Sequence, residues 1–360
     1  ELFEHYRFTV GKRQSPIRID KYVKERITSA SRNKVQNVVK NNSLLVNGKP
    51  VKPHYMVKPD DLITIHLPEP PHDKEVIPEN IPLDIIFEDQ FLMVINKPAG
   101  MIVHPGHKVI SGTLVNAMIY YFNNLADFPG KLEKPGLVHR IDKATTGLMI
   151  IAKEKNALQS LLKQFFYHNI KRTYLTLVWG KVENEKGTIQ TNLLETDIKS
   201  KPVIICHDNK GKKAITHYQV IEHLDFTTLV RCQLETGRMH QIRVHMKHIG
   251  HPVFNDKTYG GDKIPPNVGV LYITPLKGPL IRNTELTPLQ NKTSIEKLRE
   301  KIESCNNLIP GQFLHSHSMV FLHPETKKEM FFEAPLPTEM GKILEILRNN
   351  DLTHPPDPLP

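Results

Sequence analysis

The 360-residue sequence has few cysteines, no long apolar run and none of the common nucleotide-binding patterns. Its three cysteines, Cys206, Cys232 and Cys305, are far apart and odd in number, which fits neither a disulfide framework nor a thiolate metal site. We therefore expect a reducing, cytoplasmic location. No apolar run approaches the ~20 residues that cross a bilayer, so no membrane role is expected. The absence of Gly-x-x-x-x-Gly-Lys-Ser/Thr and Gly-x-Gly-x-x-Gly argues against nucleotide cofactors.

What the sequence does have is an excess of positive charge. It contains 48 Lys and Arg against 38 Asp and Glu, a net charge of +10. Much of this excess lies in residues 1–67, which contain 13 basic and 6 acidic residues. A clustered excess favours an interaction patch for a polyanion over a merely solvated basic face.

Residues 1–67 predict a small α+β module. Residues 17–27 form one amphipathic, basic helix, and a second helix is expected to begin after Ser31 as its N-cap. Strands are expected at 44–46 and 62–67, and the Asn-Gly pair after the first strand is a strong hairpin signal. Two basic helices followed by a hairpin make a compact unit.

This region resembles the RNA-binding module named for ribosomal small-subunit protein four. The resemblance rests on Arg-Ile-Asp-Lys at 18–21, Ser-Arg at 31–32, Leu-Val-Asn-Gly-Lys at 45–49 and Asp-Asp-Leu-Ile at 60–63. Asn41 and Asn42 stand where that family usually has glycine, and asparagine also enters the left-handed region. The resemblance implies phosphate contacts, which position RNA without reading its sequence. The residues expected to make them are Arg18, Lys21, Arg32, Lys34 and Lys49.

Five prolines within residues 68–82 predict an extended linker, which separates the module from a catalytic domain over 83–350. The proline-rich end, 351–360, predicts a disordered tail. Strands in the second domain are expected at 85–87, 91–95, 148–152, 173–179, 214–222, 226–234, 317–322 and 329–333. Helices are expected near 112–122, 156–168, 239–249 and 338–348. This order predicts an α+β fold on a largely antiparallel mixed sheet flanked by helices.

The turn His-Arg-Ile-Asp-Lys-Ala-Thr-Thr-Gly at 139–147 presents Asp142 between two apolar runs. The run 148–152 predicts a buried strand that holds the turn rigidly. Taken alone, Asp142 is better explained as an ordinary turn residue. The expected helix near 239–249 brings Arg243 to the border of a buried face, where a guanidinium needs a carboxylate. Asp142 is the candidate partner, and the pair would keep that acid ionised.

The second domain resembles pseudouridine synthases of the RluA/RluD group, which act on large-subunit ribosomal RNA. Matching segments occur in order at 95–105, 139–147, 171–180, 236–261 and 314–337, so with the module the resemblance covers nearly the whole chain. Two stretches depart from the family pattern. Lysines between 194 and 213 stand where the family often has an Arg-His-Pro stretch, and 262–311 is a longer connection with an expected extra helix at 293–304.

Carried over by position, the resemblance implies that Asp142 is the catalytic aspartate and that Arg140 lies near the displaced base. Arg243 becomes the ion-pair partner of the aspartate, and Tyr174 becomes the aromatic side chain that stacks on the target uracil. Further substrate-binding residues are expected to be Lys97, His139 and Ile242. A metal site at the histidines 245, 248 and 251 is a weaker alternative, because residue 250 is a helix-ending glycine.

The expected reaction converts uridine to pseudouridine in RNA, most simply in large-subunit ribosomal RNA or a pre-ribosomal particle. The protein is expected to act as a monomer. The reaction needs no cofactor, because a glycosidic bond is broken and the ring is rejoined through carbon without net redox change. The carboxylate could add covalently or remove a sugar proton, and the target must be swung out of its helix. The alternatives are a non-catalytic ribosome-assembly factor that binds RNA and a transfer-RNA pseudouridine synthase.

Overall fold

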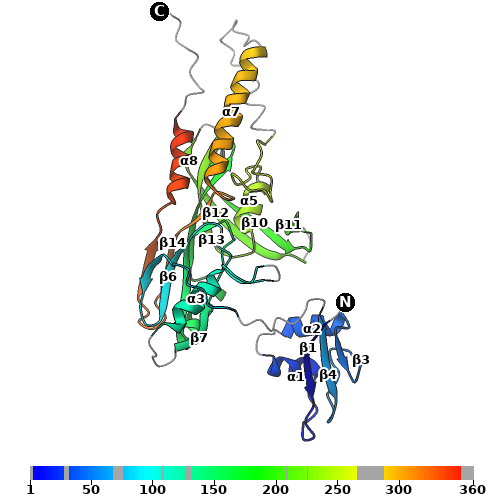
Figure 1. Cartoon of the computed structure of the whole chain (residues 1–360). Helices are drawn as coiled ribbons and strands as arrows, with labels where there is room; N and C mark the ends of the chain where they lie inside the picture. Colours follow the sequence, from blue (N-terminus) through cyan, green and yellow to red (C-terminus); the bar gives the residue numbers. More distant parts are fainter. Residues whose placement is uncertain are drawn as a thin grey trace, which may run out of the picture. The chain divides into compact units, whose positions relative to one another are not determined.

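The computed structural model describes residues 3–27, 32–67, 76–106, 109–125, 131–198, 200–206, 210–224, 226–265 and 288–349. The chain divides into two compact units, residues 1–75 and 76–360, and each unit has its own sheet (Figure 1). Within the described helices, none is long and apolar enough to cross a membrane.

The first unit is an antiparallel four-stranded sheet with two helices, which confirms the expected α+β module. Its strands follow the order β1-β4-β2-β3. The elements are β1 (Phe3–Thr9), α1 (Ile19–Arg26), α2 (Arg32–Lys40), β2 (Leu44–Val46), β3 (Lys49–Pro50) and β4 (Leu62–Leu67). Strand β1 was not predicted, because its sequence alternates weakly and carries several polar side chains.

The turns of this unit follow the sequence signals. Asn47 and Gly48 both have positive φ, +51° and +76°, as a two-residue hairpin between β2 and β3 requires. Asn42 has a φ of +57°, so asparagine takes the left-handed position after α2. Apolar side chains from α1, α2, β2 and β4 bury one another in a single core. Ser31, the expected N-cap, lies outside the described residues.

The second unit is built on one eleven-stranded mixed sheet. Its main path is β11-β10-β12-β13-β9-β14-β8-β6-β5, with β15 paired to β14 and β7 to β8. Among the described pairings β14 and β8 run parallel and the others antiparallel, which confirms the expected fold class. The strands are β5 (Ile85–Glu88), β6 (Leu92–Lys97), β7 (Lys131–Leu137), β8 (Thr146–Glu154), β9 (Lys171–Trp179), β10 (Lys186–Glu195), β11 (Val203–Cys206), β12 (Lys212–His223), β13 (Thr227–Leu234), β14 (Leu314–Leu322) and β15 (Glu329–Glu333).

Strands β7, β10 and β11 were missed by the sequence analysis. Strand β7 contains Pro-Gly and charged side chains, and β10 carries long polar stretches, so neither shows a clear alternation. Strand β14 begins at Leu314, three residues earlier than expected, and this extra length is the part that pairs with β8.

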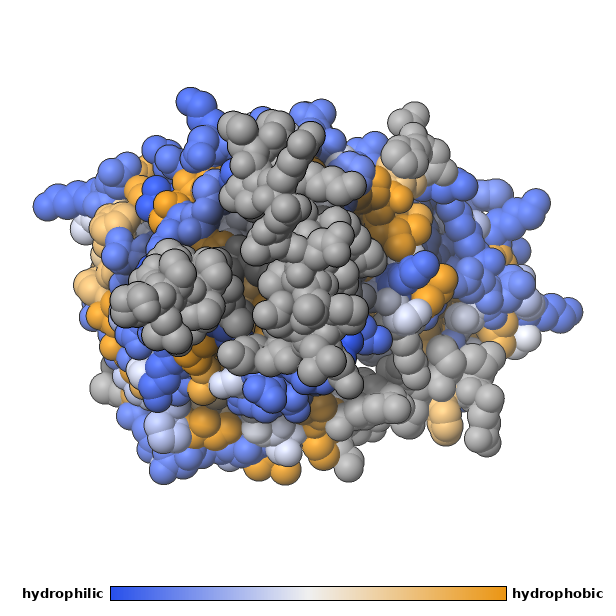
Figure 2. All heavy atoms as spheres, turned by 90° about the horizontal axis from the view of Figure 1, so that it is seen from above, coloured by the Kyte–Doolittle hydropathy of each residue, from blue (hydrophilic) through white to orange (hydrophobic). Residues whose placement is uncertain are grey.

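The helices of the second unit cover the sheet at separate places. They are α3 (Leu114–Asn123), α4 (Lys155–Phe166), α5 (Gln241–His248), α7 (Pro288–Leu308) and α8 (Thr338–Arg348). Figure 1 shows α7 and α8 side by side, and their apolar side chains, including Leu298 and Leu344, share one core cluster. The helix expected at 293–304 is therefore present and longer. Figure 2, a view from above, shows mostly hydrophilic side chains around the rim with apolar patches between them.

The expected linker 68–82 does not lie wholly between the units. Residues 68–75 are outside the described part of the chain, as is the expected tail 351–360. Residues 76–82 belong to the second unit, where Asn116 Nδ2 donates to the carbonyl of Ile77 at 2.9 Å. The Glu79 carboxylate accepts from the Gly112 backbone N–H at 3.1 Å, which fixes this stretch beside α3.

Candidate active site

Asp142 lies in the turn that leads into β8, and the neighbouring strand holds this turn in place. The Asp142 carbonyl accepts from the Thr145 N–H at 3.1 Å, and Gln312 Nε2 donates to the Thr145 hydroxyl at 3.1 Å. Gly147 has a φ of +103°, and a Cβ there would overlap the backbone of Ser316 in β14. Glycine is therefore required where the parallel strand comes alongside, and that contact fixes the turn that presents Asp142.

Lys97 holds this turn in place through hydrogen bonds to backbone carbonyls. It does not line the cavity that contains Asp142. Its side chain is fully buried, and its ammonium donates to the carbonyls of Pro98, Met101 and Lys143 at 2.8, 3.0 and 3.1 Å. Burial lowers the pKa of Lys97 to about 8, against the opposite effect of the Asp142 carboxylate. All three carbonyls belong to turns next to Asp142, so the lysine is placed to position the acid.

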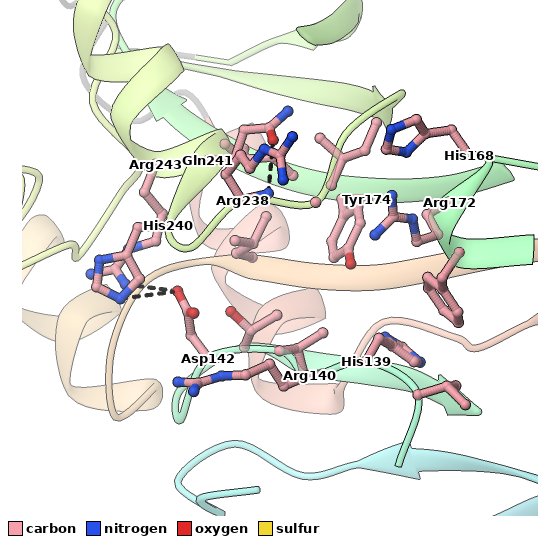
Figure 3. A pocket seen from close by; sticks show the side chains of 18 of the residues that line it. His139, Arg140, Asp142, His168, Arg172, Tyr174, Arg238, His240, Gln241 and Arg243 are labelled. Carbon is pink, nitrogen blue, oxygen red and sulfur yellow. Dashed lines mark hydrogen bonds and ion pairs between the residues drawn. The ribbon is translucent and has the colours of Figure 1, made fainter. Parts of the chain in front are cut away.

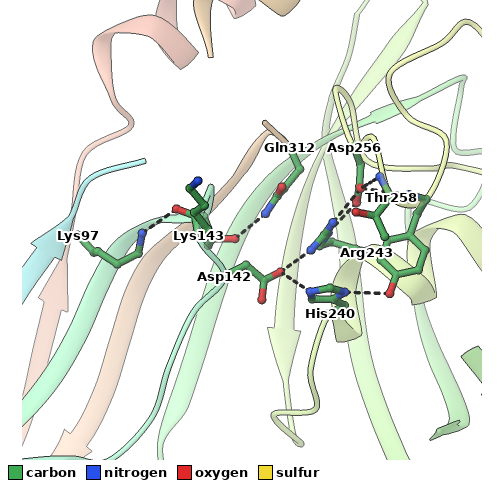
Figure 4. A network of polar contacts seen from close by, with 10 residues as sticks. Lys97, Asp142, Lys143, His240, Arg243, Asp256, Thr258 and Gln312 are labelled. Atoms are coloured by element: carbon green, nitrogen blue, oxygen red, sulfur yellow. Dashed lines mark hydrogen bonds and ion pairs between the residues drawn. The ribbon is translucent and has the colours of Figure 1, made fainter. Parts of the chain in front are cut away.

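Arg243 forms the ion pair that the sequence predicted. Its Nη1 donates to Asp142 Oδ2 at 2.7 Å, and the two side chains are 6% and 19% exposed. The same guanidinium donates through Nε and Nη2 to Asp256 at 2.7 and 2.9 Å. Arg243 thus bridges two carboxylates, and its bidentate grip on Asp256 orients Nη1 toward Asp142 (Figure 4).

Asp256 was missed by the sequence analysis. Its side chain is fully buried, and Oδ1 also accepts from the backbone N–H groups of Thr258 and Tyr259 at 3.0 and 3.2 Å. Burial alone would lower the pKa of Arg243, but the hydrogen bonds and charge of Asp256, together with Asp142, raise it. In the sequence, the only signal for Asp256 was its place within the matching segment 236–261.

His240 is a second neighbour of the acid that the sequence analysis missed. It is the N-cap of α5 in the left-handed conformation, with a φ of +54°. Its Nδ1 is hydrogen-bonded to the Tyr259 hydroxyl at 2.9 Å, and its Nε2 lies 3.8 Å from Asp142 Oδ2. Burial lowers the pKa of His240. The nearby carboxylates raise this pKa, and the nearby arginines lower it. The unusual backbone conformation aims the ring at Asp142.

A cavity of about 540 Å³ opens beside Asp142, a volume suited to a small-molecule or nucleoside-sized ligand. Its lining brings together six of the seven residues expected at the catalytic and substrate-binding site, namely His139, Arg140, Asp142, Tyr174, Ile242 and Arg243 (Figure 3). Tyr174 projects from β9 and is 6% exposed, and burial raises the pKa of its phenol. Lys97 is the one residue of the set that is absent from this lining.

Two of the lining residues differ in exposure. The half-buried His139 ring stacks on Phe165 with centroids 4.8 Å apart, and its Nε2 accepts from the Ile150 N–H at 2.9 Å. Burial, aided by Arg172, lowers the pKa of His139 to about 3, so the ring is neutral. Arg140 is exposed at the turn and also lines a second cavity of about 460 Å³, which Asp142 lines as well.

The basic residues expected to contact RNA are placed unevenly. Lys21, Lys34 and Lys49 are exposed, whereas the side chain of Arg32 lies outside the described residues. Arg18 is engaged within the module, because its Nε and Nη2 donate to the buried Asp20 at 3.1 and 2.9 Å. Its guanidinium is therefore partly committed to anchoring the start of α1.

Two of the three histidines of the alternative metal site have protein partners. His245 is buried between the hydroxyls of Thr191 and Thr216, each 2.9 Å from a ring nitrogen. His251 Nδ1 lies 2.8 Å from the carbonyl oxygen of Trp179. Among the residues for which the structure gives positions, no group of three or more His, Cys, Asp or Glu is arranged to hold a metal ion.

Comparisons with known proteins identify the family of this chain. The family model for RNA pseudouridylate synthase matches residues 91–248, and that for the S4 domain matches 17–63. An uncharacterized RNA pseudouridine synthase of Chlorobaculum parvum is 40% identical over 94% of this chain and 96% of that protein. The ribosomal large subunit pseudouridine synthase D of Escherichia coli O6:H1 is 34% identical over 94% of this chain and 93% of its own.

A solved structure supports the fold. Human RNA pseudouridylate synthase domain containing 4 superposes with a TM-score of 0.52 at 21% identity, covering 74% of this chain and 93% of that one. Since the identity is low, this likeness concerns the fold alone. These two relatives match most of this chain and most of their own length, and a family model matches part of each unit. The chain belongs to the RNA pseudouridine synthase family, as an isomerase whose amino-terminal unit is an RNA-binding S4 domain.

Proposed function

We propose that this pseudouridine synthase modifies uridines of large-subunit ribosomal RNA and that Asp142 is its catalytic carboxylate. The observation that carries the proposal is the ion pair of Asp142 with Arg243 at the wall of a cavity that also contains Tyr174. Relatives that span nearly the whole chain bear the name ribosomal large subunit pseudouridine synthase D, which supports the choice of RNA.

The chemistry requires few groups. The bond between N1 of uracil and C1′ of ribose breaks, the base turns within the site, and a bond forms between C5 and C1′. The C5 proton then leaves and N1 becomes an N–H, so atoms and charge balance without an outside reactant. A carboxylate kept ionised by Arg243 can act on the sugar or base, and a buried aromatic ring can hold the loosened uracil by stacking.

The remaining residues have supporting roles in this proposal. Arg140, exposed at the turn, contacts the RNA near the place vacated by the flipped base. His139 and Ile242 shape the cavity, and Lys97 positions the turn of Asp142. The S4 domain binds RNA phosphates through exposed lysines such as Lys21, which adds affinity without sequence readout.

The test is a pseudouridine map of ribosomal RNA from cells whose only copy of the protein carries Asp142→Asn. We expect at least one mark to be lost, with a fall in turnover of about 10³-fold or more for the purified variant. Retained marks with defective ribosome assembly would make the protein a binding factor. A mark lost from transfer RNA alone would instead overturn the assignment of the substrate.

A further inference from the structure

The cavity contains a buried cation for which the proposed chemistry has no use. Arg172 lies near the start of β9 and is 6% exposed, and it lines the same cavity as Asp142 and Tyr174. Its Nε is buried without a hydrogen-bond partner, and no ion pair joins its guanidinium to another residue of the described part of the chain. A buried, uncompensated guanidinium is costly, so its retention here indicates a ligand that supplies the missing acceptor.

The surroundings of Arg172 hold it in place without neutralising it. Its guanidinium carbon lies 5.5 Å from the centre of the Phe165 ring, a cation–π distance. On the other side, a Cβ at Gly237 would lie 2.6 Å from Nη1, so glycine leaves the room that the guanidinium occupies. Figure 3 shows the side chain within the cavity, beside Tyr174. The cation is thus fixed by packing while its donors remain available.

The direction of the cavity decides which part of a pyrimidine Arg172 would meet. Arg172 and Tyr174 are two residues apart on β9, so their side chains lie on the same face of the strand with Cα atoms ~7 Å apart. In Figure 3 the labelled side chains run from Asp142 past Tyr174 to Arg172. A uracil stacked on Tyr174 with its ribose at Asp142 therefore points its far edge at Arg172.

We propose, resting on the function proposed above, that Arg172 donates a hydrogen bond to the uracil carbonyl opposite the glycosidic bond and so selects uracil over cytosine. In uridine this oxygen is O4. Cytosine carries an amino donor there, which a donor-only guanidinium cannot accept. When the ring turns to exchange N1 with C5, O2 takes the place of O4, so the same contact serves the substrate and the product.

The experiment is a cycle of binding measurements with an RNA oligonucleotide that contains a uridine modified by the wild-type enzyme. All proteins carry Asp142→Asn to prevent turnover, and the second RNA replaces the target with the pyrimidin-2-one ribonucleoside, which lacks O4. Without further change, loss of O4 should weaken binding about 10- to 100-fold. Pyrimidin-2-one also lacks the N3–H of uracil, so the O4 contact is measured as the part of the loss that disappears in Arg172→Met. This variant should weaken binding of the uridine RNA by a similar factor, and exchange of the target should then cost much less than it costs without Arg172→Met.

Controls separate this inference from a structural role and from the proposed function. Arg231→Met removes an exposed arginine of the neighbouring strand β13 and should leave the effect of O4 removal unchanged. Arg172→Met should also reduce the preference for uridine over cytidine at the target, while the variant stays folded. Losses that add independently would overturn the O4 contact and indicate an RNA phosphate instead. The choice of ribosomal RNA is tested separately, because the oligonucleotide is taken from whichever RNA the wild type modifies.

Discussion

The two buried arginines of the cavity face opposite electrostatic situations. Arg243 bridges Asp142 and Asp256, so its charge is more than balanced by the chain itself. Arg172 is equally buried, since 6% of the whole residue is exposed against 5% for Arg243. No ion pair joins Arg172 to another residue that the structure describes. A buried cation with protein partners thus holds the carboxylate of Asp142 in place, whereas one without such partners is available to a ligand.

The largest loss of stability should come from removing a carboxylate partner of Arg243. Asp256→Asn leaves Arg243 with one carboxylate and removes the grip that aims Nη1 at Asp142. Removal of one partner from a buried pair costs about 3–5 kcal/mol, and we expect a loss of stability near the lower figure because Asp142 remains. Urea unfolding followed by fluorescence of the single, buried Trp179 measures this loss. Unchanged stability with full activity would contradict the bridging role.

The pH dependence of stability should also report on burial, because a buried histidine can lose its charge whereas a buried arginine cannot. Burial lowers the pKa of His139 to about 3 and those of His245 and His315 to about 4. Below the unfolded value of 6.5 the unfolded chain binds protons that the folded chain excludes. The free energy of unfolding should thus have its full value above pH 6.5. Below pH 6.5 it should fall toward pH 4, by up to ~1.4 kcal/mol per pH unit for each histidine.

A single variant checks this assignment. His245→Gln keeps hydrogen-bonding groups near Thr191 and Thr216 but cannot be protonated, so its unfolding free energy should fall less steeply between pH 6.5 and pH 4. The same slope in the variant and the wild type would remove His245 from the explanation. As a control, the same measurement is made for His54→Gln, which replaces an exposed histidine.

A smaller effect, of opposite sign, should follow from Arg172→Met. The variant removes an uncompensated buried charge and keeps much of the apolar volume, so stability should rise by about 1 kcal/mol. The urea midpoint measures this gain, and binding of the uridine RNA should fall in the same variant. A clear loss of stability would mean that the charge has a partner of its own and that the two arginines do not differ in kind.

The smallest effect should come from an ion pair at the surface. Arg348 and Glu222 are 2.6 Å apart but 47% and 34% exposed, so solvent screens the interaction. Glu222→Gln should cost well below about 1 kcal/mol. A loss as large as that of Asp256→Asn would show that burial does not set the scale of these effects.

Much of the site could be predicted because its parts follow local patterns. The sequence predicted the apolar run of β8, the turn before it and the helical face that includes Ile242. These patterns led to the predicted pair Asp142–Arg243. The resemblance supplied Tyr174. Arg172 lies two residues before Tyr174 on the same strand face, so alternation alone could have placed it in the cavity.

Other parts could not be predicted, because they depend on atoms that only the folded chain brings together. Lys97 was expected to contact substrate, yet its ammonium is surrounded by three carbonyls from turns that are separate in sequence. Asp256 lies 13 residues beyond Arg243, outside the helix on which periodicity could have paired them. Strand β7 shows no alternation, since pairing with β8 and not its own side chains decides its conformation.

The sequence by itself determined the family, the two-unit organisation, most helices and strands, and the acid with its arginine. These properties are set by periodic burial and by short motifs, which act over a few residues. The tertiary structure alone decided which buried charges are neutralised and which are left for a ligand. The reason is physical: the cost of a buried charge depends on the few atoms within hydrogen-bond distance, and here those atoms come from distant strands and turns.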